Sequence, residues 1–293
     1  MKKTTPSIFL VAFLLASFSP AAAADPASGG RTALRLYGGL NTMSGGDFNR
    51  GLCGWLDLWA HAGSSWGVDT DVAGSPGGWG TVLGADVLFP LTSWLSFGMG
   101  AGRVTARDVC RSSAEGSGGA VPDEQSIEMS LESLPVRAGF FAHIPFSERL
   151  EICLHAGAVY HYLARTQAVY RRDWESYTEE DRFDLKSSGL GYDGGLGLEL
   201  SLGRHVSVFL DGQFRWAKFS KLFGTLDRTS SEGGEESREG TLYLFDYSLG
   251  DDEIFTLVDI LSQAPSGPAF PRAAEAVADF GGFSLVVGVL LKL

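Results

Sequence analysis

The chain has 293 residues, a formal net charge of −12 and a hydrophobic content of 44%. The acidic balance argues against nucleic acid as a partner, because nucleic acids select for basic surfaces. Glycine is abundant (39 residues), aromatic residues make up 12%, and long helical periodicity is missing from the sequence. Together these features are typical of an all-β protein.

The first 24 residues have the three parts of a secretory signal peptide. A basic segment (MKKTTP) precedes an apolar segment (SIFLVAFLLASF), and small residues follow it (SPAAAAD). The small residues predict cleavage after Ala22 or Ala24. The apolar run of about 12 residues is too short to span a bilayer as a helix. The sequence therefore predicts a signal peptide over 1–24 and one domain over 25–293.

Eight segments of the remaining chain alternate apolar with small or charged residues, as strands with two different faces do. They are TALRLYGGLN (32–41), WGTVLGADVLF (79–89), WLSFGMGAGRV (94–104), SIEMSLESLPVRAGFFAH (126–143), LEICLHAGAVYHYLA (150–164), the two halves of DGGLGLELSLGRHVSVFLDGQFRW (193–216), and FSLVVGVLLKL (283–293).

The alternation slips by one residue within the fourth segment. Met129 and Leu131 share a face, whereas Leu134 continues the apolar face one residue late. A β-bulge inserts one extra residue into a strand, and proline is tolerated beside it. The sequence therefore predicts a bulge near 132–134, next to Pro135, with the apolar face turned the same way on both sides of it.

Short and long connections alternate along the chain. PLTS, PFSER and GRH are short, whereas the stretches at about 43–78, 108–125, 169–187 and 221–278 are long, polar and acidic. Short turns at one end and long loops at the other are the layout of a bacterial outer-membrane barrel. An even number of strands would place both termini at the end with the short turns.

Three segments in the predicted loops have their own patterns. GGDFNRGLCGWLDLWAHAG (45–63) places apolar residues at helical spacing after an Asp or Asn cap, which predicts a short helix. DDEIFTLVDILSQ (251–263) carries an apolar stripe behind acidic residues, which predicts an amphipathic helix in the last loop. TLYLFDYSL (241–249) fits an extra hairpin arm in the same loop.

Three features favour a lipid-facing barrel over a soluble, lipocalin-like one. The polar faces contain glycine, serine and scattered charges, whereas a face in water would be dense in Lys, Glu and Thr. Eight closed strands satisfy every backbone polar group, as crossing lipid requires. Aromatic residues flank the apolar faces near strand ends, as interfacial girdles do: Trp79, Trp94, Tyr160, Tyr162, Tyr192 and Trp216. We predict a closed up-and-down antiparallel transmembrane β-barrel of about eight strands.

The signal peptide, YGGLN (37–41), GGDFNRG (45–51), the four strand pairs and the apolar alternating C-terminus resemble small outer-membrane β-barrel proteins of the OmpA/OmpX-like and OmpW-like group. The resemblance covers the whole chain after the signal peptide and is mostly one of pattern. It implies a place in the Gram-negative outer membrane, with outer-membrane lipids and the barrel-assembly machinery as partners. One departure is the last residue, Leu293, where the family usually has an aromatic residue that the assembly machinery reads.

The inward faces of the predicted strands collect ionisable residues. The interior of an eight-stranded barrel is just wide enough for side chains, so these charges must pair. We therefore expect a salt-bridged plug, with a narrow ion path as the alternative. The predicted lumen network comprises Arg35, Asp86, Glu132, Arg137, Glu151, His155, Asp193, Glu199, Asp211, Arg215 and Lys292.

Other candidate sites are weaker. Glu151, Cys153 and His155 share one face and are zinc-ligand types, but a fourth ligand is not identifiable, so we expect lumen filling, no metal and no cofactor. Cys53 and Cys110 fall in the first two predicted outer loops, and an oxidising compartment makes a disulfide between them a hypothesis, with unpaired thiols as the alternative.

The segment His205–Ser207 resembles the His-x-Ser pair of outer-membrane lipid A deacylases. Strand parity turns both residues inward here, next to a short turn, which is the wrong end for that substrate. We therefore expect no enzyme. The expected function is a non-catalytic scaffold that presents large acidic loops for envelope integrity or for an extracellular partner. The alternatives are a porin-like channel or carrier for small or apolar molecules and, third, a lipid-modifying enzyme.

Overall fold

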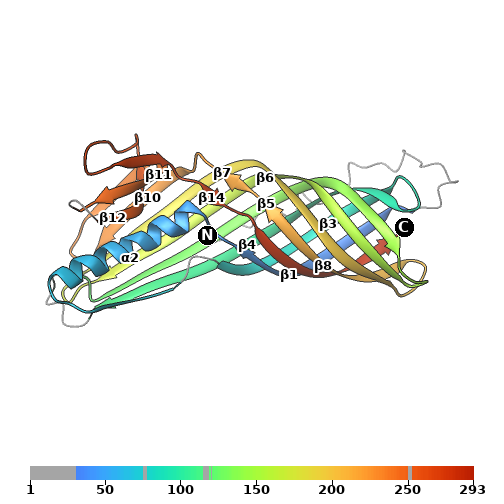
Figure 1. Ribbon diagram of the computed structural model, residues 1–293, viewed down its shortest axis with the longest axis horizontal. Coiled ribbons are helices and arrows are strands. Elements are labelled where there is room, and N and C mark those ends of the chain that lie inside the picture. The colour runs from blue at the N-terminus through green and yellow to red at the C-terminus, as the bar shows by residue number, and fades with distance from the viewer. Residues whose placement is uncertain (1–30, 75–77, 115–118, 120, 250–252) are drawn as a thin grey trace.

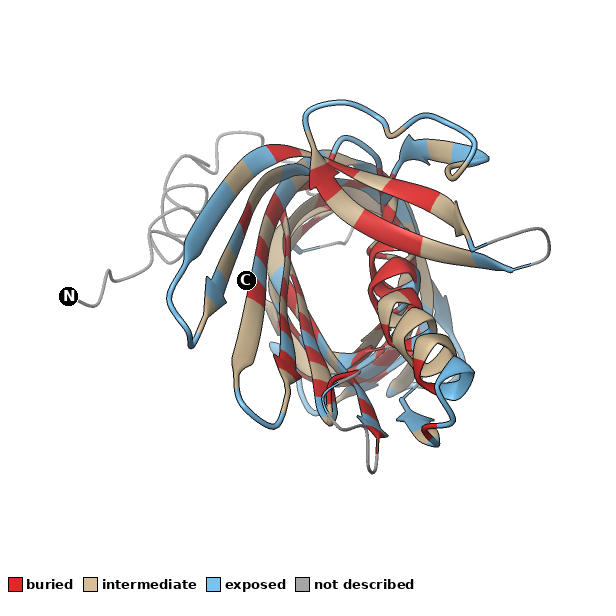
Figure 2. Cartoon of the chain, turned by 90° about the vertical axis from the view of Figure 1, so that its left-hand side faces the viewer, coloured by how far each residue is buried: buried red, intermediate tan, exposed pale blue. Residues whose placement is uncertain are grey.

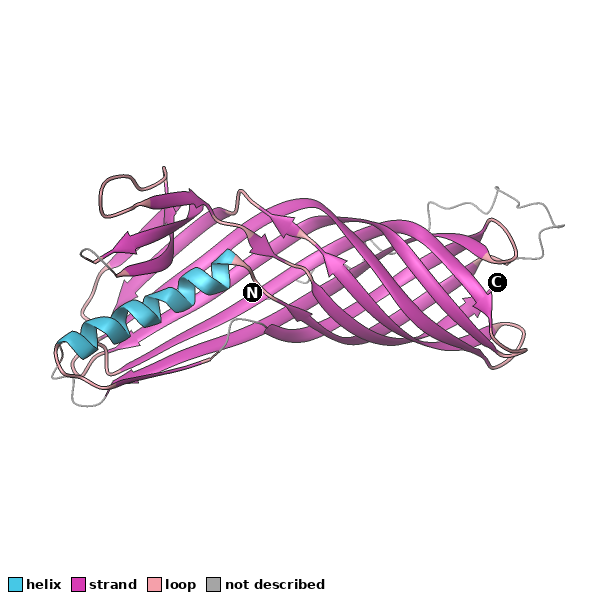
Figure 3. Cartoon of the chain, viewed as in Figure 1, coloured by secondary structure: helices cyan, strands magenta, loops and turns pink. Residues whose placement is uncertain are grey.

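The computed structural model describes residues 31–74, 78–114, 119, 121–249 and 253–293; the predicted signal peptide lies outside the described residues. Eight antiparallel strands close into one ring (Figures 1 and 3). They are β1 (Ala33–Met43), β3 (Gly78–Pro90), β4 (Leu95–Ala114), β5 (Glu124–Pro145), β6 (Leu150–Asp173), β7 (Thr178–Ser201), β8 (Val206–Trp216) and β15 (Gly282–Lys292). Each strand pairs with the next, and β15 pairs with both β8 and β1 to complete the ring. The predicted eight-stranded barrel is confirmed.

The short turns 91–94, 146–149 and 202–205 gather at one end of the barrel, which we call the turn end. Two of them are closed by a hydroxyl: Thr92 Oγ1 accepts from the Leu95 amide, and Ser147 Oγ accepts from the Leu150 amide. Such side-chain bonds substitute for a backbone turn. The first and last described residues of the ring are also at this end, since the Leu293 amide donates to the Thr32 carbonyl over 2.8 Å.

The strands fall into two length classes. β1, β8 and β15 have 11 residues each and β3 has 13, close to the length of a tilted strand that crosses a bilayer. β4, β5, β6 and β7 have 20, 22, 24 and 24 residues, and they continue well beyond the ring. The predicted long loops at 108–125 and 169–187 are therefore wrong for residues 108–114, 124–125, 169–173 and 178–187, which are strand because the polar strands keep pairing outside the lipid-facing band. Residues 115–118 and 120 lie outside the described residues.

The prolonged strands form what we call the extended layer, the half of the molecule opposite the turn end (Figure 1). Its sheet runs in the order β2-β4-β5-β6-β7-β10-β11-β12, and β13 is a third partner of β11. The additional strands are β2 (Thr70–Ala73), β10 (Phe223–Ser230), β11 (Glu235–Ser248), β12 (Ile254–Leu261) and β13 (Arg272–Glu275). The predicted hairpin arm at 241–249 is thus a strand of this sheet.

The predicted helix at 251–263 is wrong, because this segment contains strand β12, which pairs with β11 along its whole length. Its apolar residues fit the spacing of a helix as well as that of a strand, and the pairing with β11 selects the strand. Leu257, Val258 and Ile260 are fully buried in the core of the layer.

Helix α2 (Asp47–Ser65) confirms the predicted helix and fills the gap between β12 on one side and β2 and β4 on the other. Figure 2 shows its buried face turned toward the strands. Trp55 Nε1 donates to the Val258 carbonyl, which would otherwise be an open edge group of β12. Gly54 permits this approach, since a Cβ there would lie 2.0 Å from the Thr256 carbonyl oxygen. The extended layer is therefore a sheet closed by a helix.

The apolar face changes sides between the two halves of the molecule. In the ring, large apolar residues such as Leu196, Leu210 and Val287 are exposed on the outer surface. In the extended layer, Ile127 and Met129 of β5 are buried inside. The predicted register shift is present between Leu134 and Pro135, but the extra residues lie on β6 between His161 and Ala164, and the alternation of β5 itself does not slip. A strand whose apolar residues face outward to lipid in one half and inward to a core in the other half shows the same one-residue slip in alternation as a strand with a bulge.

The exposed aromatic residues mark two levels of the outer surface. Trp94 and Phe146 belong to the turn end, and the other predicted girdle residues lie where the ring meets the extended layer. Trp216 pairs with Tyr192 across β8 and β7, and both side chains are more than 60% exposed. The band between these levels is apolar, as a membrane-spanning surface requires. In the described ranges, we find no helix that is long and apolar enough to cross a membrane.

Candidate functional site

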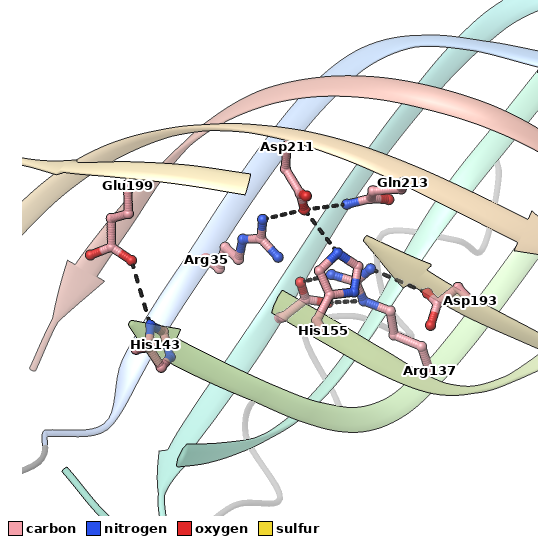
Figure 4. Close-up of polar contacts among 9 residues, drawn as sticks. Arg35, Arg137, His143, His155, Asp193, Glu199, Asp211 and Gln213 are labelled. Atoms are coloured by element: carbon pink, nitrogen blue, oxygen red, sulfur yellow. Dashed lines mark hydrogen bonds and ion pairs between the residues drawn. The ribbon is translucent and has the colours of Figure 1, made fainter. Parts of the chain in front are cut away.

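The lumen of the ring holds two clusters, in each of which an arginine is ion-paired with a buried aspartate (Figure 4). The first is built on Asp211 of β8, which is completely buried. Its Oδ2 atom accepts from Arg35 Nη2 at 2.6 Å and from Gln213 Nε2 at 3.0 Å, and it lies 3.0 Å from His155 Nε2. The Arg35 guanidinium also lies 3.9 Å from the ring centroid of Phe209. Charge, hydrogen bonds and a cation–π contact therefore hold one buried ion pair.

The second cluster is built on Arg137 of β5. Its guanidinium binds Asp86 of β3 in the two-pronged arrangement, with Nε 2.7 Å from Oδ1 and Nη2 in contact with Oδ2. Nη1 reaches Asp193 of β7 at 3.4 Å. Bidentate Arg–carboxylate pairs are among the strongest hydrogen-bonded contacts in proteins. The cluster ties three strands together across the lumen.

Two glycines on the inward faces make room for these clusters. A Cβ at Gly100 would lie 2.0 Å from Asp86 Oδ1, and a Cβ at Gly195 would lie 2.3 Å from His155 Nε2. The small residues between the apolar residues of β4 and β7 therefore define the space that the charged side chains occupy.

A third group lies nearer the turn end. Lys292 Nζ is 3.1 Å from Glu199 Oε1, and His143 Nδ1 lies 4.0 Å from Glu199 Oε2 and 3.7 Å from Glu151 Oε2. Figure 4 shows His143 and Glu199 facing each other from β5 and β7. Sequence reasoning missed His143, although it continues the inward-facing alternation of Arg137 in the same strand.

Arg215 takes a different kind of partner from the other lumen arginines. Its Nε donates to the Phe280 carbonyl at 2.8 Å and its Nη2 to Asn41 Oδ1 at 3.1 Å. Phe280 belongs to an apolar plug that lies between the charged lumen and the extended layer. The plug comprises Phe219, Leu222, Ala276, Ala278 and Phe280, all buried, and the short strands β9 (Lys218–Phe219) and β14 (Ala278–Asp279) pair within it.

Above the plug, the extended layer has an apolar interior to which α2 and the strands β4, β5, β6, β7, β10, β11 and β12 contribute. Phe48, Leu52 and Leu56 of α2 are fully buried there, and Phe48 meets Phe183 of β7 edge to face at 6.4 Å. Nothing in the local sequence of 217–222 or 276–280 indicated a plug, because its residues become inward-facing only when the two segments meet.

One predicted lumen residue is placed wrongly. Glu132 lies on the outer surface of β5, where its Oε1 accepts from Arg103 Nε at 2.7 Å. Its neighbours Leu131 and Ser133 are the buried ones. The other ten predicted residues line the lumen or its mouth, and the structure brings them together in the groups described above.

Two Ser–His relationships bear on the enzyme alternative. Ser207 is buried in the lumen, whereas His205 is exposed in the turn and contacts the Lys292 carbonyl, so they form no pair. Ser133 Oγ and His161 Nδ1 lie 2.5 Å apart. Both are fully buried, and the His161 ring is covered by Phe219 at 5.1 Å. Neither side chain of this second pair is exposed on the surface of the structure.

Cys53 of α2 and Cys110 of β4 lie side by side, with their Sγ atoms 2.6 Å apart. No disulfide joins them in the structure, and the mutual contact together with burial raises the pKa of Cys53. Cys153 is a separate buried thiol on β6. The predicted disulfide therefore stays a prediction, now with the two sulfur atoms in contact.

These features define a transmembrane β-barrel of eight strands with a charged lumen, an apolar plug and a helix-closed extended layer. Three solved structures are similar in architecture. They are a major outer membrane protein from Thermus thermophilus (TM-score 0.44, 12% identity, 89% of this chain and 99% of that chain), the outer membrane protease OmpT from Escherichia coli (0.42, 7%, 90% and 97%) and the outer membrane protein OprG from Pseudomonas aeruginosa (0.35, 11%, 90% and 96%). No protein-family model matches the sequence, and no curated protein matches it significantly. These identities are too low to carry residue roles to this chain.

Proposed function

We propose that this protein is a non-catalytic, non-conducting scaffold of the outer membrane that presents its extended layer at the cell surface. The observation that carries the proposal is the filled interior. Paired charges occupy the lumen, the apolar plug lies above them, and an apolar core fills the extended layer. A solute would have to displace all three.

Two small cavities lie in the lumen, and neither is large enough for a path. The larger of the two has a volume of about 30 Å³ and is lined by Tyr37, Arg137 and Arg215, among others. The smaller has about 10 Å³ and lies beside Arg35 and His143. One water needs roughly 10–15 Å³, so the larger cavity suits about two waters and the smaller at most one. This supports the salt-bridged plug over the narrow ion path.

The proposed location rests on the outer surface of the ring. Its apolar band and two aromatic levels suit outer-membrane lipids, and the turn end would face the periplasm, where the barrel-assembly machinery acts. The extended layer, whose outer surface is charged, would then face the medium and offer the surface for an extracellular partner.

Planar-bilayer recording tests the closed interior. We expect the purified barrel to show no steady single-channel steps, and a double variant Phe219→Ala/Phe280→Ala, which opens the plug, to show more frequent current events than the wild type. Steady steps of uniform size from the wild type would overturn the proposal in favour of a channel. Lipid A mass spectra that differ between cells with and without the protein would overturn it in favour of an enzyme.

Labelling of intact cells tests the orientation. A membrane-impermeant maleimide should label Glu232→Cys, in the exposed β10–β11 turn, and should not label Arg204→Cys, in the exposed turn between β7 and β8. The reverse labelling pattern would place the turn end outside.

A further inference from the structure

We propose that His143, Glu151 and Glu199 form a binding site for one divalent transition-metal ion, of the class of Zn²⁺, at the turn end of the lumen. The site is separate from the scaffold role, which does not depend on it. It differs from the Glu151, Cys153 and His155 set that the sequence suggested, because His155 is engaged by Asp211 in the first lumen cluster.

The three side chains come from three adjacent strands. Glu151 of β6 and Glu199 of β7 are direct partners in the register, and His143 of β5 is the partner of Cys153, one inward position further along β6. Their ligand atoms, one imidazole nitrogen of His143 and one oxygen of each carboxylate, all lie within 4.8 Å of one another. The pairing of the strands thus converges one imidazole and two carboxylates without any loop.

The donor set and its spacing suit such an ion. Zn²⁺ takes His nitrogen and Glu oxygen at about 2.0–2.2 Å, so two ligands of a tetrahedral site lie roughly 3.4 Å apart. The distances from His143 Nδ1 to the two carboxylate oxygens are 3.7 and 4.0 Å. Small rotations of the glutamate side chains would close this difference. Three protein ligands leave further coordination positions for water.

The charge balance of these side chains gives an independent reason to expect a bound cation. Carboxylates directly opposite each other in a sheet repel, and a buried charge is normally paired or bound to a metal. Glu199 is only 3% exposed. Its Oε1 lies 3.1 Å from Lys292 Nζ but makes no hydrogen bond, while its Oε2 lies 4.0 Å from His143 Nδ1. With a neutral imidazole, one ammonium faces two carboxylates, which leaves one negative charge for a cation to neutralise.

A small cavity adjoins these ligands. It has about 10 Å³ and is lined by His143, Cys153 and Glu199, among others. Glu151, which is partly exposed, completes the rim. An ion entering from the turn end would therefore meet Glu151 first and the buried Glu199 behind it.

Calorimetric titration of the tag-free chain, folded in detergent micelles, with ZnCl₂ tests the proposal. We expect one Zn²⁺ per chain. His143→Gln and Glu199→Gln should each weaken binding by at least about 10-fold, since even residues that only support metal ligands contribute 10- to 100-fold. Lys292→Met, which removes the competing ammonium, should bind at least as tightly as the wild type. Titration with Co²⁺ should show the visible absorption of a nitrogen- and oxygen-bound ion in the wild type and lose it in His143→Gln.

Two histidine variants serve as matched controls. His205→Gln removes the exposed histidine of the neighbouring turn, and His61→Gln removes a histidine that faces Glu253 at the far end of the molecule. Both should bind Zn²⁺ like the wild type. Heat-modifiable gel mobility shows whether each variant folds, and Glu151→Gln at the rim provides the test if a buried variant does not fold. Absence of one-to-one binding, equal binding by the wild type and His143→Gln, or loss of binding only in a control would overturn the site.

Discussion

The Arg35–Asp211 pair offers the sharpest test of how the lumen is held. Asp211→Asn keeps the shape of the side chain and removes its charge, which leaves the Arg35 guanidinium 3% exposed and without its counter-ion. Breaking a buried ion pair from one side costs about 3–5 kcal/mol, and the lower end applies here because the amide oxygen still accepts a hydrogen bond. Arg35→Met removes the other partner and also its contact with Phe209, which is worth up to about 2 kcal/mol.

The double variant Arg35→Met/Asp211→Asn leaves no unpaired charge in this pair. We expect it to be less destabilised than the sum of the two single variants by about 2 kcal/mol, because groups in direct contact couple by about 0.5–3 kcal/mol. Urea unfolding in lipid vesicles, followed by tryptophan fluorescence, measures all four members of the cycle. Additive effects within about 0.5 kcal/mol, or a cost below about 1 kcal/mol for Asp211→Asn, would refute the paired-charge description of the lumen.

Three further predictions concern the extended layer. Non-reducing mass mapping of protein from an oxidising compartment should find Cys53 linked to Cys110, and two free thiols would contradict this. Because the link closes a loop of about 60 residues, its reduction should lower the free energy of unfolding by up to about 4 kcal/mol. Gly54→Val should displace α2, since a Cβ there meets a β12 carbonyl at 2.0 Å. We expect faster proteolysis of the extended layer, while the ring keeps its heat-modifiable gel mobility. Gly203→Ala, where a Cβ meets nothing within 4 Å, should have no effect. Burial raises the pKa of Asp259, so the folded state holds this proton more tightly than the unfolded state, and stability should fall as the pH rises from the unfolded value through the folded pKa. Asp259→Asn should remove that fall, and urea midpoints that change equally with pH in both proteins would exclude it.

Much of the ring was predictable from local pattern. In DGGLGLELSLGRHVSVFLDGQFRW, most of the residues from Leu196 to Trp216 that were expected to face lipid are exposed, Val208 is half-buried, and GRH is part of the turn. The reason is that a lipid-facing strand needs an apolar residue at every second position, whatever its neighbours are. Most lumen residues followed from the same parity.

The alternation alone, however, does not determine which face of a strand is buried. Met129 and Leu131 were assigned to the lipid face, yet they lie in the core of the extended layer, and Glu132 consequently lies outside. The segment Ile254–Leu261 fits both a helical and a strand period, and its pairing with β11 selects the strand.

The sequence by itself therefore determined that the chain forms a lipid-facing barrel, which strands line it and which charges turn inward, because these depend on alternation within single strands. Only the tertiary structure decided which charges meet. Arg137 reaches Asp86 and Asp193 from strands far apart in sequence, and His143 joins Glu151 and Glu199 only through the register of three strands. The plug and the helix-closed layer were decided in the same way, since their residues become a core only when distant segments come together.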